Sequence, residues 1–198
     1  MNSKVREKRN YFDRCSLSWS RTPLSESERI ILREVLPPKA IFPGETVLDL
    51  GGGTGRLADY LRRRFAVEVL VVDISGWMLR RGCRESCRLI QADGHRLPLR
   101  SRSLNHVFCF CAFPHFDDPE MILREVRRVL LPGGGIFILH NQSRGELNQY
   151  HLRKAPEVAA DLLPPLSSFR NWGAKLGFKT FRLEDRKSGF IVHLKLPE

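Results

Sequence analysis

The sequence has no hydrophobic run long enough to cross a membrane. Apolar stretches such as Val69–Val72 and Val107–Pro114 fall far short of the roughly 20 residues that a bilayer-spanning helix needs. The first residues, Met1–Arg6, are not followed by the apolar segment of a signal peptide. We therefore expect a cytoplasmic protein without a membrane span.

The sequence also lacks cysteine and histidine spacings that suit a metal. It has five cysteines, an odd number, and we expect them to be reduced in the cytoplasm. A helix would place Cys83 and Cys87 on one face, and a strand would do the same for Cys109 and Cys111. Neither pair has the spacing of a zinc knuckle. We therefore expect no metal site and interpret the thiols as small buried hydrophobic groups.

Acidic residues are scarce beside the basic ones. The 22 Asp and Glu residues face 33 Lys and Arg residues, which gives a net charge of +11 and a pI near 10.0. Such an excess is typical of an anionic partner such as nucleic acid, or of an arginine-rich solvated surface. The basic residues gather in three runs: Arg62–Arg64; Arg80, Arg81, Arg84 and Arg88; and Arg96, Arg100 and Arg102. We expect the first two runs to lie on helices that flank the sheet, where a solvated surface is the ordinary explanation.

Short apolar strands alternate with amphipathic helices along most of the chain. Capping residues begin three helices: the Ser25–Glu28 capping box, Ser75, and Asp118 followed by Pro119. Repeated alternation is typical of a parallel sheet covered by helices on both faces. The sequence therefore predicts an α/β fold, a Rossmann-like doubly wound, mostly parallel sheet with an antiparallel hairpin at one edge. The predicted strands are Val47–Leu50, Val67–Val72, Leu89–Ala92, Val107–Phe110, Ile136–Leu139, Thr180–Leu183 and Phe190–Leu196.

A glycine-rich turn follows the first strand, at the edge where α/β sheets bind ligands. The glycines of Gly51–Gly55 let the backbone turn sharply and approach a ligand closely, and a helix amino terminus follows. At the ends of the next two strands, Asp73 can accept hydrogen bonds from ribose hydroxyls, and Asp93 with Gly94 offers a polar edge to a base. An aspartate at either position can also simply cap a helix. Together, these features indicate a nucleoside-containing cofactor.

The same residues favour one cofactor over another. A dinucleotide fingerprint needs a third glycine where this chain has Arg56. Asp49 precedes the glycines, and a carboxylate there suits a ligand with a positive group rather than a pyrophosphate. S-adenosylmethionine (SAM) joins an adenosine to a cationic methionine, so it fits better than a nicotinamide cofactor.

Several of these segments resemble class I SAM-dependent methyltransferases. They are Val47–Gly55, Val72–Leu79, Ala92–Pro98, Phe116–Pro119, Glu125–Leu130 and Pro132–Gly134, preceded by Tyr11–Arg14. The last three segments and Tyr11–Arg14 are similar to the subgroup that includes ubiquinone- and menaquinone-pathway methyltransferases. The resemblance covers about residues 10–140.

The resemblance implies a cofactor site at the strand ends. Gly51 and Gly53 would meet the methionine part of SAM, Asp73 its ribose hydroxyls, and Asp93 the adenine amino group. The full set of predicted cofactor-binding residues is Asp49, Gly51, Gly52, Gly53, Asp73, Ile74, Met78, Ala92, Asp93, Gly94, Cys109 and Phe110.

Apolar residues of this set would form the walls of the site. By the resemblance, Ile74 and Met78 would pack against the adenine, while Cys109 and Phe110 would border the methionine. An aromatic face near the sulfonium could also stabilise its charge. The candidates for that position are Tyr11, Trp19, Phe110 and Phe113.

We expect residues 1–198 to form a single methyltransferase domain with four parts. Residues 1–38 would be an N-terminal helical lid or entry segment, and residues 44–140 the SAM-binding core. We expect Pro132–Gly135 to interrupt the chain before the last strand of that core. Residues 141–168 would be a variable segment on the acceptor side, and residues 169–198 the final helix and hairpin.

Catalysis places few demands on individual residues, because methyl transfer depends mainly on alignment of the reacting atoms. A base is needed only if the acceptor must lose a proton. His115, just beyond the fourth strand, is the best candidate, and His140 is a weaker one. A loop histidine that caps the next helix is the ordinary alternative. The chain departs from many relatives at Pro114, where a His–His pair is common, and at Asn105, where an aspartate is common.

We therefore expect a SAM-dependent methyltransferase that acts on a small-molecule acceptor. The chain has neither the motif of amino-group nucleic-acid methyltransferases nor the Pro-Cys pair of cytosine C5 chemistry. Two alternatives stay open: an RNA or ribonucleoprotein methyltransferase, with nucleic acid as partner, and a SAM-binding protein without catalysis. The sequence indicates neither the acceptor nor the oligomeric state.

Overall fold

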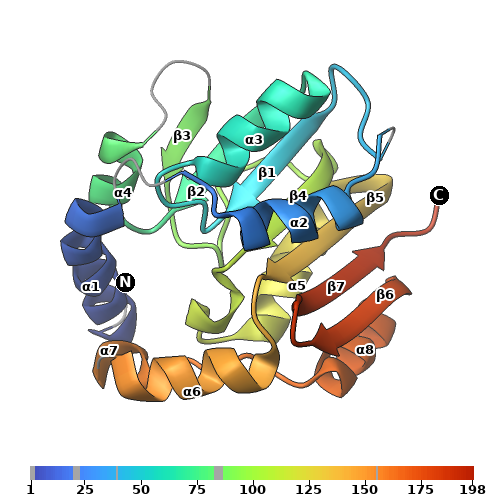
Figure 1. The fold of residues 1–198 in the computed structure, drawn as a ribbon. Coiled ribbons are helices and arrows are strands. Elements are labelled where there is room, and N and C mark those ends of the chain that lie inside the picture. Colours follow the sequence, from blue (N-terminus) through green and yellow to red (C-terminus); the bar gives the residue numbers. More distant parts are fainter. Residues whose placement is uncertain (1–2, 20–22, 39, 83–86, 155) are drawn as a thin grey trace.

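The computed structural model describes residues 3–19, 23–38, 40–82, 87–154 and 156–198 (Figure 1). Its strands are β1 (Thr46–Leu50), β2 (Glu68–Asp73), β3 (Arg88–Gln91), β4 (Leu104–Phe110), β5 (Leu130–His140), β6 (Lys179–Arg186) and β7 (Gly189–Lys195). These strands form one sheet in the order β3-β2-β1-β4-β5-β7-β6. Neighbours from β3 to β5 are parallel, and β7 is antiparallel to both β5 and β6. The predicted α/β sheet with its edge hairpin is confirmed.

Helices cover both faces of this sheet. They are α1 (Ser3–Trp19), α2 (Glu26–Val35), α3 (Arg56–Phe65), α4 (Gly76–Arg81), the 3₁₀ turn η1 (Phe113–His115), α5 (Pro119–Val129), α6 (Arg144–Lys154), α7 (Pro156–Ala159) and α8 (Leu166–Lys175). The predicted caps are present: Ser25 and Glu28 form a capping box, Ser75 Oγ accepts from the Met78 N–H, and Asp118 Oδ1 accepts from the Met121 N–H. Each cap satisfies a backbone donor that the helix itself cannot.

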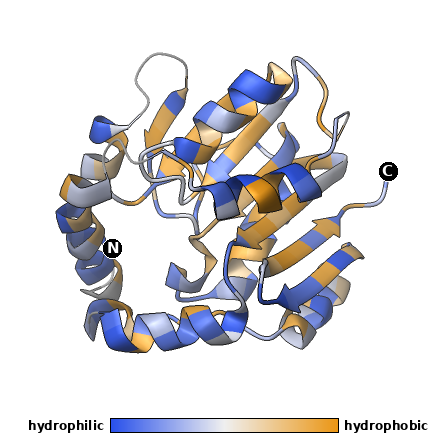
Figure 2. Cartoon of the chain, viewed as in Figure 1, coloured by the Kyte–Doolittle hydropathy of each residue, from blue (hydrophilic) through white to orange (hydrophobic). Residues whose placement is uncertain are grey.

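Side chains that alternate along the strands build one apolar layer on each face of the sheet. On one face, Val126 of α5 and Phe169 of α8 belong to a buried cluster with Val107 and Ile138. On the other face, α2 and α3 pack their buried leucines and isoleucine against the second cluster of strand residues. Figure 2 shows the result, with hydrophobic strands enclosed by helices whose outer faces are hydrophilic. Burial on both faces leaves the strand ends as the part of the sheet open to ligands.

β5 is longer than the sequence predicts. It begins at Leu130, directly after α5, and contains Pro132–Gly134, which we expected to interrupt the chain. A Cβ on Gly134 would lie 2.6 Å from the backbone oxygen of Asn105, so glycine permits the close approach of this strand to β4. The carbonyl of Gly134 accepts from the Leu196 N–H. The glycines therefore bend a continuous strand rather than end it.

We expected the arginine run after Ser75 to lie on one helix, but the structure divides it between α4 and β3. α4 ends at Arg81, where the Gly82 N–H bonds to the Leu79 carbonyl. Cys87 precedes β3, and Arg88 begins that strand. Cys83 and Arg84 lie outside the described residues. The expectation of one helical face for Cys83 and Cys87 is therefore wrong for Cys87.

α1 lies at the edge of the molecule, beside α4 and α7 (Figure 1). It is bound to α4 by a 2.5 Å hydrogen bond from Ser75 Oγ to Asp13 Oδ1, and to α7 by the ion pair between Arg14 and Glu157. These contacts hold α1 over the ends of β1 and β2, which is where the sequence predicts the site.

No described helix is long and apolar enough to cross a membrane, and no group of His, Cys, Asp and Glu side chains in the described ranges could hold a metal ion. The cytoplasmic location stays a prediction.

Candidate functional site

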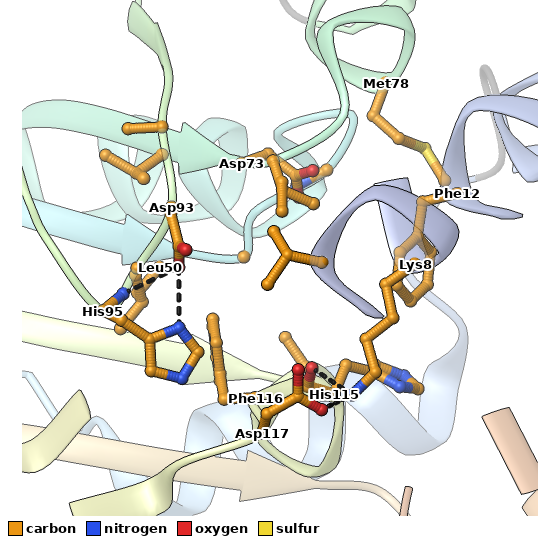
Figure 3. A pocket seen from close by; sticks show the side chains of 18 of the residues that line it. Lys8, Phe12, Leu50, Asp73, Met78, Asp93, His95, His115, Phe116 and Asp117 are labelled. Carbon is orange, nitrogen blue, oxygen red and sulfur yellow. Dashed lines mark hydrogen bonds and ion pairs between the residues drawn. The ribbon is translucent and has the colours of Figure 1, made fainter. Parts of the chain in front are cut away.

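A pocket of about 750 Å³, including its open mouth, lies at the carboxyl ends of β1, β2, β3 and β4 (Figure 3). α1 forms its outer wall, and the turn from β4 into η1 forms its floor. The residues that line it are Val5, Lys8, Phe12, Trp19, Leu50, Gly51, Gly53, Val72, Asp73, Ile74, Met78, Ala92, Asp93, Gly94, His95, Cys111, Ala112, His115, Phe116 and Asp117.

The glycine turn forms the part of the pocket nearest β1. Gly51 and Gly53 have φ angles of 72° and 55°, a region that side chains disfavour. A Cβ on Gly51 would lie 2.7 Å from the Cβ of Ala112, and a Cβ on Gly53 would point toward the carboxylate of Asp73. Both glycines are therefore required for the backbone to line the pocket.

Asp73, at the end of β2, is held in place by two backbone donors. Its Oδ2 accepts from the Gly53 N–H at 2.8 Å, and its Oδ1 accepts from the Ser75 N–H at 2.8 Å. A carboxylate has about four acceptor positions, so roughly two remain for a ligand. Burial raises the pKa of Asp73 to about 6, because it penalises the charged form more than these backbone bonds stabilise it. Asp73 is therefore a preorganised hydrogen-bond acceptor that is ionised above about pH 6.

Asp93, beyond the end of β3, is oriented by His95. Oδ1 of Asp93 accepts from the His95 N–H and lies 2.6 Å from Nδ1 of the same residue. Nε2 of His95 accepts from the Asp118 N–H, so the proton of the neutral ring lies on Nδ1 and is donated to Asp93. Among the described residues, Oδ2 of Asp93 has no hydrogen-bond partner. The aspartate therefore presents one free acceptor atom next to Gly94.

The space between the two aspartates is apolar. Ile74, Met78, Ala92 and Phe116 line it. The Phe116 ring lies so close to Gly94 that a Cβ on that residue would be 2.8 Å from the ring. Met78 is almost fully buried, so its sulfur and methyl group form a fixed wall. Acceptor atoms at both ends of a flat apolar slot suit a nucleoside, with hydroxyls at one end and an exocyclic amine at the other.

Asp49 is not among the residues that line the pocket, although the sequence predicts a cofactor contact for it. It is 1% exposed, and a Cβ on Gly52 would lie 2.6 Å from its carboxylate, so the turn itself covers it. Among the described residues, neither carboxylate oxygen has a hydrogen bond of normal geometry. Burial and the nearby charge of Asp73 raise the pKa of Asp49 to about 7, and the amide of Ala58 offsets this only in part. The structure places Asp49 beneath the glycine turn, where it acts on the pocket through its charge.

The β4 side of the pocket is formed by different residues from those predicted. Cys109 is fully buried in the core, and Phe110 packs on the opposite face of the sheet. Cys111 and Ala112 line the pocket instead. Cys111 has a φ of 54°, so the chain turns sharply there and Cys109 and Cys111 do not share a strand face, contrary to expectation. On this side, the residues that line the pocket therefore lie two positions further along the chain than predicted.

His115 lines the pocket and is paired with an aspartate from a distant part of the sequence. Its Nδ1 lies 2.7 Å from Oδ2 of Asp161. Burial lowers the pKa of His115 below its usual value, even though the hydrogen bond to Asp161 opposes this. The ring is therefore neutral near pH 7. Because the carboxylate can only accept, Nδ1 carries the proton and the lone pair is on Nε2.

Lys8 connects this pair to α1. Its Nζ donates to the backbone oxygen of His115 and forms ion pairs with Asp117 at 2.6 Å and Asp161 at 2.9 Å. Burial alone would raise the pKa of Asp161, but the His115 hydrogen bond and the Lys8 ammonium hold the pKa below its usual value. The Phe12 ring meets the edge of the His115 imidazole, with centroids 4.9 Å apart.

Two further histidines lie behind His115. The ring of His151 in α6 is 5.0 Å from that of His115, and its Nδ1 lies 2.5 Å from the Asp161 carbonyl. Burial and the two neighbouring histidines lower the pKa of His140 to about 3, so it stays neutral. His140 does not line the pocket. Of the two candidate bases, His115 and His140, it is therefore His115 that could contact an acceptor.

Two residues of the site could not be identified from the sequence alone. Lys8 lies in α1 and lines the pocket, and Asp161, which pairs with His115, follows α7; no motif connects either residue to the strand ends. Phe12 lies in Tyr11–Arg14, a segment that resembles the methyltransferases. Two other residues had a usable signal. His95 follows Asp93 by two positions, a spacing that suits a local turn, and Phe116 lies in a segment that resembles the methyltransferases. Of the aromatic candidates, Trp19 lines the pocket, and Tyr11, Phe110 and Phe113 do not.

Comparison with known proteins gives the class of this site. Residues 48–138 match the family described as a methyltransferase domain. A ubiquinone/menaquinone biosynthesis C-methyltransferase (UbiE) from Idiomarina loihiensis is 31% identical over 56% of this chain and 48% of its own length. A malonyl-acyl-carrier-protein O-methyltransferase from a Marinomonas species is 30% identical over 69% of this chain and 52% of its own length. The chain thus spans about half the length of these curated relatives.

A solved structure shows the same fold over the whole chain. A chain of the complex between the Haloferax volcanii Trm112 methyltransferase activator and a methyltransferase aligns with a TM-score of 0.73, at 16% identity, over 100% of this chain and 99% of that one. The fold, the site and the family match define residues 48–138 as a class I SAM-dependent methyltransferase domain, whose cofactor is SAM. Within that class the chain resembles the ubiquinone/menaquinone C-methyltransferases.

The donor set of the pocket fits SAM. The two acceptor aspartates, the apolar slot between them and the cradle of Gly51 and Gly53 match a ribose, an adenine and an amino-acid tail. The buried charge of Asp49 beneath the turn suits a ligand that carries an ammonium and a sulfonium. A dinucleotide would instead place a pyrophosphate against this carboxylate.

Proposed function

We propose that this protein transfers the methyl group of SAM to a small-molecule acceptor whose attacking atom is deprotonated by His115. The observation that carries the proposal is His115, which lines the same pocket as the cofactor residues and is hydrogen-bonded to Asp161 at its far ring nitrogen. SAM supplies an electrophilic methyl group on a sulfonium. The residues of the chain must hold the acceptor in line with that methyl group and exclude water.

In this proposal the cofactor is held at the strand ends. Asp73 binds the ribose hydroxyls, Asp93 binds the adenine amino group through Oδ2, and Ile74 and Met78 pack against the adenine. The backbone of Gly51 and Gly53 meets the amino-acid tail. Gly52, Cys109 and Phe110 do not line the pocket, and we assign them no direct contact with the cofactor.

The acceptor would enter on the side of α1 and the segment before α8. Residues 1–38 would act as the lid and residues 141–168 as the acceptor segment, because Lys8 and Asp161 from these parts meet at His115. Apart from histidines, Lys8 is the one basic side chain among the described residues that line the pocket. A pocket of this size and charge favours a small acceptor over a nucleic-acid strand.

The base would work through Nε2 of His115. Asp161 accepts the proton on Nδ1, which fixes the tautomer and stabilises the positive charge that develops when Nε2 takes a proton from the acceptor. The lowered pKa of His115 keeps Nε2 unprotonated near pH 7. The acceptor is therefore an acidic carbon, hydroxyl or amine rather than an atom that is already a free nucleophile. Relatives named as C- and O-methyltransferases support this range of acceptors.

The test is turnover of SAM to S-adenosylhomocysteine across a panel of phenolic, enolic and amine acceptors, followed by variants. His115→Ala should lower the rate about 100-fold or more. Asp161→Asn should lower the rate by a smaller factor and shift the acid limb of the pH–rate profile to lower pH, because the carboxylate that raises the pKa of His115 is gone. Binding of S-adenosylhomocysteine should stay within about twofold in both variants, because neither residue is assigned to the cofactor.

Two results would contradict the proposal. Full activity of His115→Ala on every accepted substrate would show that His115 is not the base. Cofactor binding without turnover on any member of the panel would instead support a SAM-binding protein without catalysis.

A further inference from the structure

A second concave region lies on the other side of the glycine turn from the cofactor pocket. It has a volume of about 1480 Å³, including its open mouth, and lies between α2, α3, the end of the glycine turn and the end of α4. We call it the arginine groove. The residues that line it are Pro23, Leu24, Arg29, Arg33, Thr54, Gly55, Arg56, Asp59, Tyr60, Arg63, Arg64, Arg81 and Gly82.

The groove is strongly cationic. Six arginines and one aspartate are among its lining residues, a formal charge of +5. Ion pairs offset part of this charge: Arg33 with Glu26, Arg56 with Glu28, and Arg63 with Asp59. Counting the two glutamates, which lie just outside the lining, the local charge is still +3.

Half of the arginines keep their charge uncompensated. Among the described residues, no carboxylate lies within 4 Å of the guanidinium groups of Arg29, Arg64 or Arg81. Arg29 donates through Nε to the Leu24 carbonyl, which fixes its orientation and uses one of its five N–H groups. Guanidiniums from three helices that converge on one concavity repel each other, and a concave wall concentrates their field. An anion in the groove removes that repulsion.

An exposed tryptophan adjoins the groove. Trp77 of α4 is 49% exposed, although tryptophan is usually buried. The guanidiniums of Arg80 and Arg81 lie over its ring, at 5.2 Å and 5.8 Å from the centroid. Because Arg81 also lines the groove, the ring is continuous with the cationic surface. A flat aromatic face beside a row of arginines offers stacking for a base and ion pairs for phosphates.

We propose that the arginine groove binds a single-stranded nucleic acid, with phosphates along Arg29, Arg33 and Arg64 and an unpaired base on Trp77. A single strand fits better than a duplex, because a stacking face is useful only to a base that is not already paired. This binding is independent of the methyl acceptor, since the groove and the pocket lie on opposite sides of the glycine turn. It also accounts for part of the net charge of +11, which the cofactor pocket does not use.

The test is fluorescence anisotropy with labelled oligouridylate and oligodeoxythymidylate of about ten nucleotides, measured over a series of salt concentrations. The wild-type protein should bind at low salt, with an affinity that falls steeply as salt rises. Arg33→Gln with Arg64→Gln should weaken binding about tenfold or more and reduce the salt slope by roughly 1.4, about 0.7 for each phosphate contact. Preference between the two probes identifies RNA or DNA as the source of the strand.

A matched control separates the groove from net charge. Arg100→Gln with Arg127→Gln removes the same charge from exposed positions outside the groove, and it should change the affinity less than twofold. Trp77→Ala should weaken binding by about fivefold or more with little change in the salt slope, because stacking releases no counterions. Circular dichroism and S-adenosylhomocysteine binding confirm that each variant is folded.

Three outcomes would overturn the inference. The first is no binding of either probe at low salt. The second is an equal loss of affinity in the control double variant, which would mean that net charge alone attracts the strand. The third is unchanged affinity in Trp77→Ala together with equal binding of a duplex, which would remove the single-strand site.

Discussion

The glycine turn separates two concave regions of opposite charge. On one side, the cofactor pocket holds Asp73, Asp93 and Asp117 and is underlain by Asp49. On the other side, the groove holds six arginines and one aspartate. The same loop contributes to both, with Gly51 and Gly53 in the pocket and Gly55 in the groove. Net charge therefore says little about what either region binds, because the acidic pocket is built into a basic protein.

The two regions also differ in how their charges are held. Two carboxylates at the pocket are deeply buried: Asp73 is bound by backbone donors, and Asp49 beneath the turn makes no hydrogen bond of normal geometry among the described residues. The arginines of the groove are mostly exposed, and their ion pairs lie on the surface. Buried charges alter stability and ligand affinity strongly, whereas exposed pairs contribute little and are screened by salt. The predictions below follow from that difference.

The largest effect should come from neutralising the buried carboxylate. The pKa of Asp49 is raised from 3.8 to about 7, so its ionised form destabilises the folded state increasingly as pH rises through that range. Three pKa units correspond to about 4 kcal/mol, an upper bound for the gain in unfolding free energy of Asp49→Asn near pH 8. Near pH 4 the gain should almost vanish. Denaturant unfolding at both pH values measures it.

The groove offers a matched control for this stability effect. Asp59→Asn removes an exposed carboxylate that pairs with Arg63, and it should change the unfolding free energy by less than about 1 kcal/mol at either pH. Equal effects of the two substitutions would show that the charges of the pocket and of the groove are not held differently.

The next effect should be on cofactor affinity. Asp73→Ala removes the proposed acceptor for the ribose hydroxyls, and hydrogen bonds to a charged group are worth about 1.5–3 kcal/mol. The Kd of S-adenosylhomocysteine should therefore rise by a factor of about 10 to 150, as measured by isothermal titration calorimetry. Asp59→Ala, in the first turn of α3 and on the groove side, should leave the Kd unchanged. An unaltered Kd in Asp73→Ala would refute the role of this residue.

The smallest effect should be that of salt on cofactor binding. S-adenosylhomocysteine carries no net charge, and the acceptors that it meets are enclosed by the turn and by α1. Raising the salt concentration should thus change its Kd less than about twofold, whereas nucleic-acid binding in the groove should fall steeply. A steep salt dependence for both ligands would mean that the pocket and the groove do not differ in this way.

The sequence predicts the cofactor side of the site better than the acceptor side. Asp73, Asp93 and the glycines follow directly from short strands whose carboxyl ends meet at one edge of the sheet, so local pattern is enough to place them. Lys8 and Asp161 meet at His115 only because α1 and the segment after α7 fold over that edge. Their contact depends on packing between regions about 150 residues apart, which no periodicity in either region indicates.

Errors in the sequence interpretation also have local physical causes. The expected break at Pro132–Gly134 is part of β5, because the glycines allow close approach to β4 and pair with the C-terminal segment. By the resemblance, Cys109 and Phe110 would border the methionine, but neither residue lines the pocket. The left-handed turn at Cys111 moves that position forward instead. Asn105, which stands where an aspartate is common, has a structural role. Its Oδ1 accepts a hydrogen bond from the Thr46 N–H and joins β4 to the start of β1.

The most direct test of the account is thermal unfolding with two ligands at equal concentration. S-adenosylhomocysteine should raise the Tm, because it binds the folded state at the acidic pocket, and NAD should leave the Tm unchanged, because its pyrophosphate would meet the charge of Asp49 beneath the turn. Stabilisation by NAD with no response to S-adenosylhomocysteine or SAM would contradict the central claim.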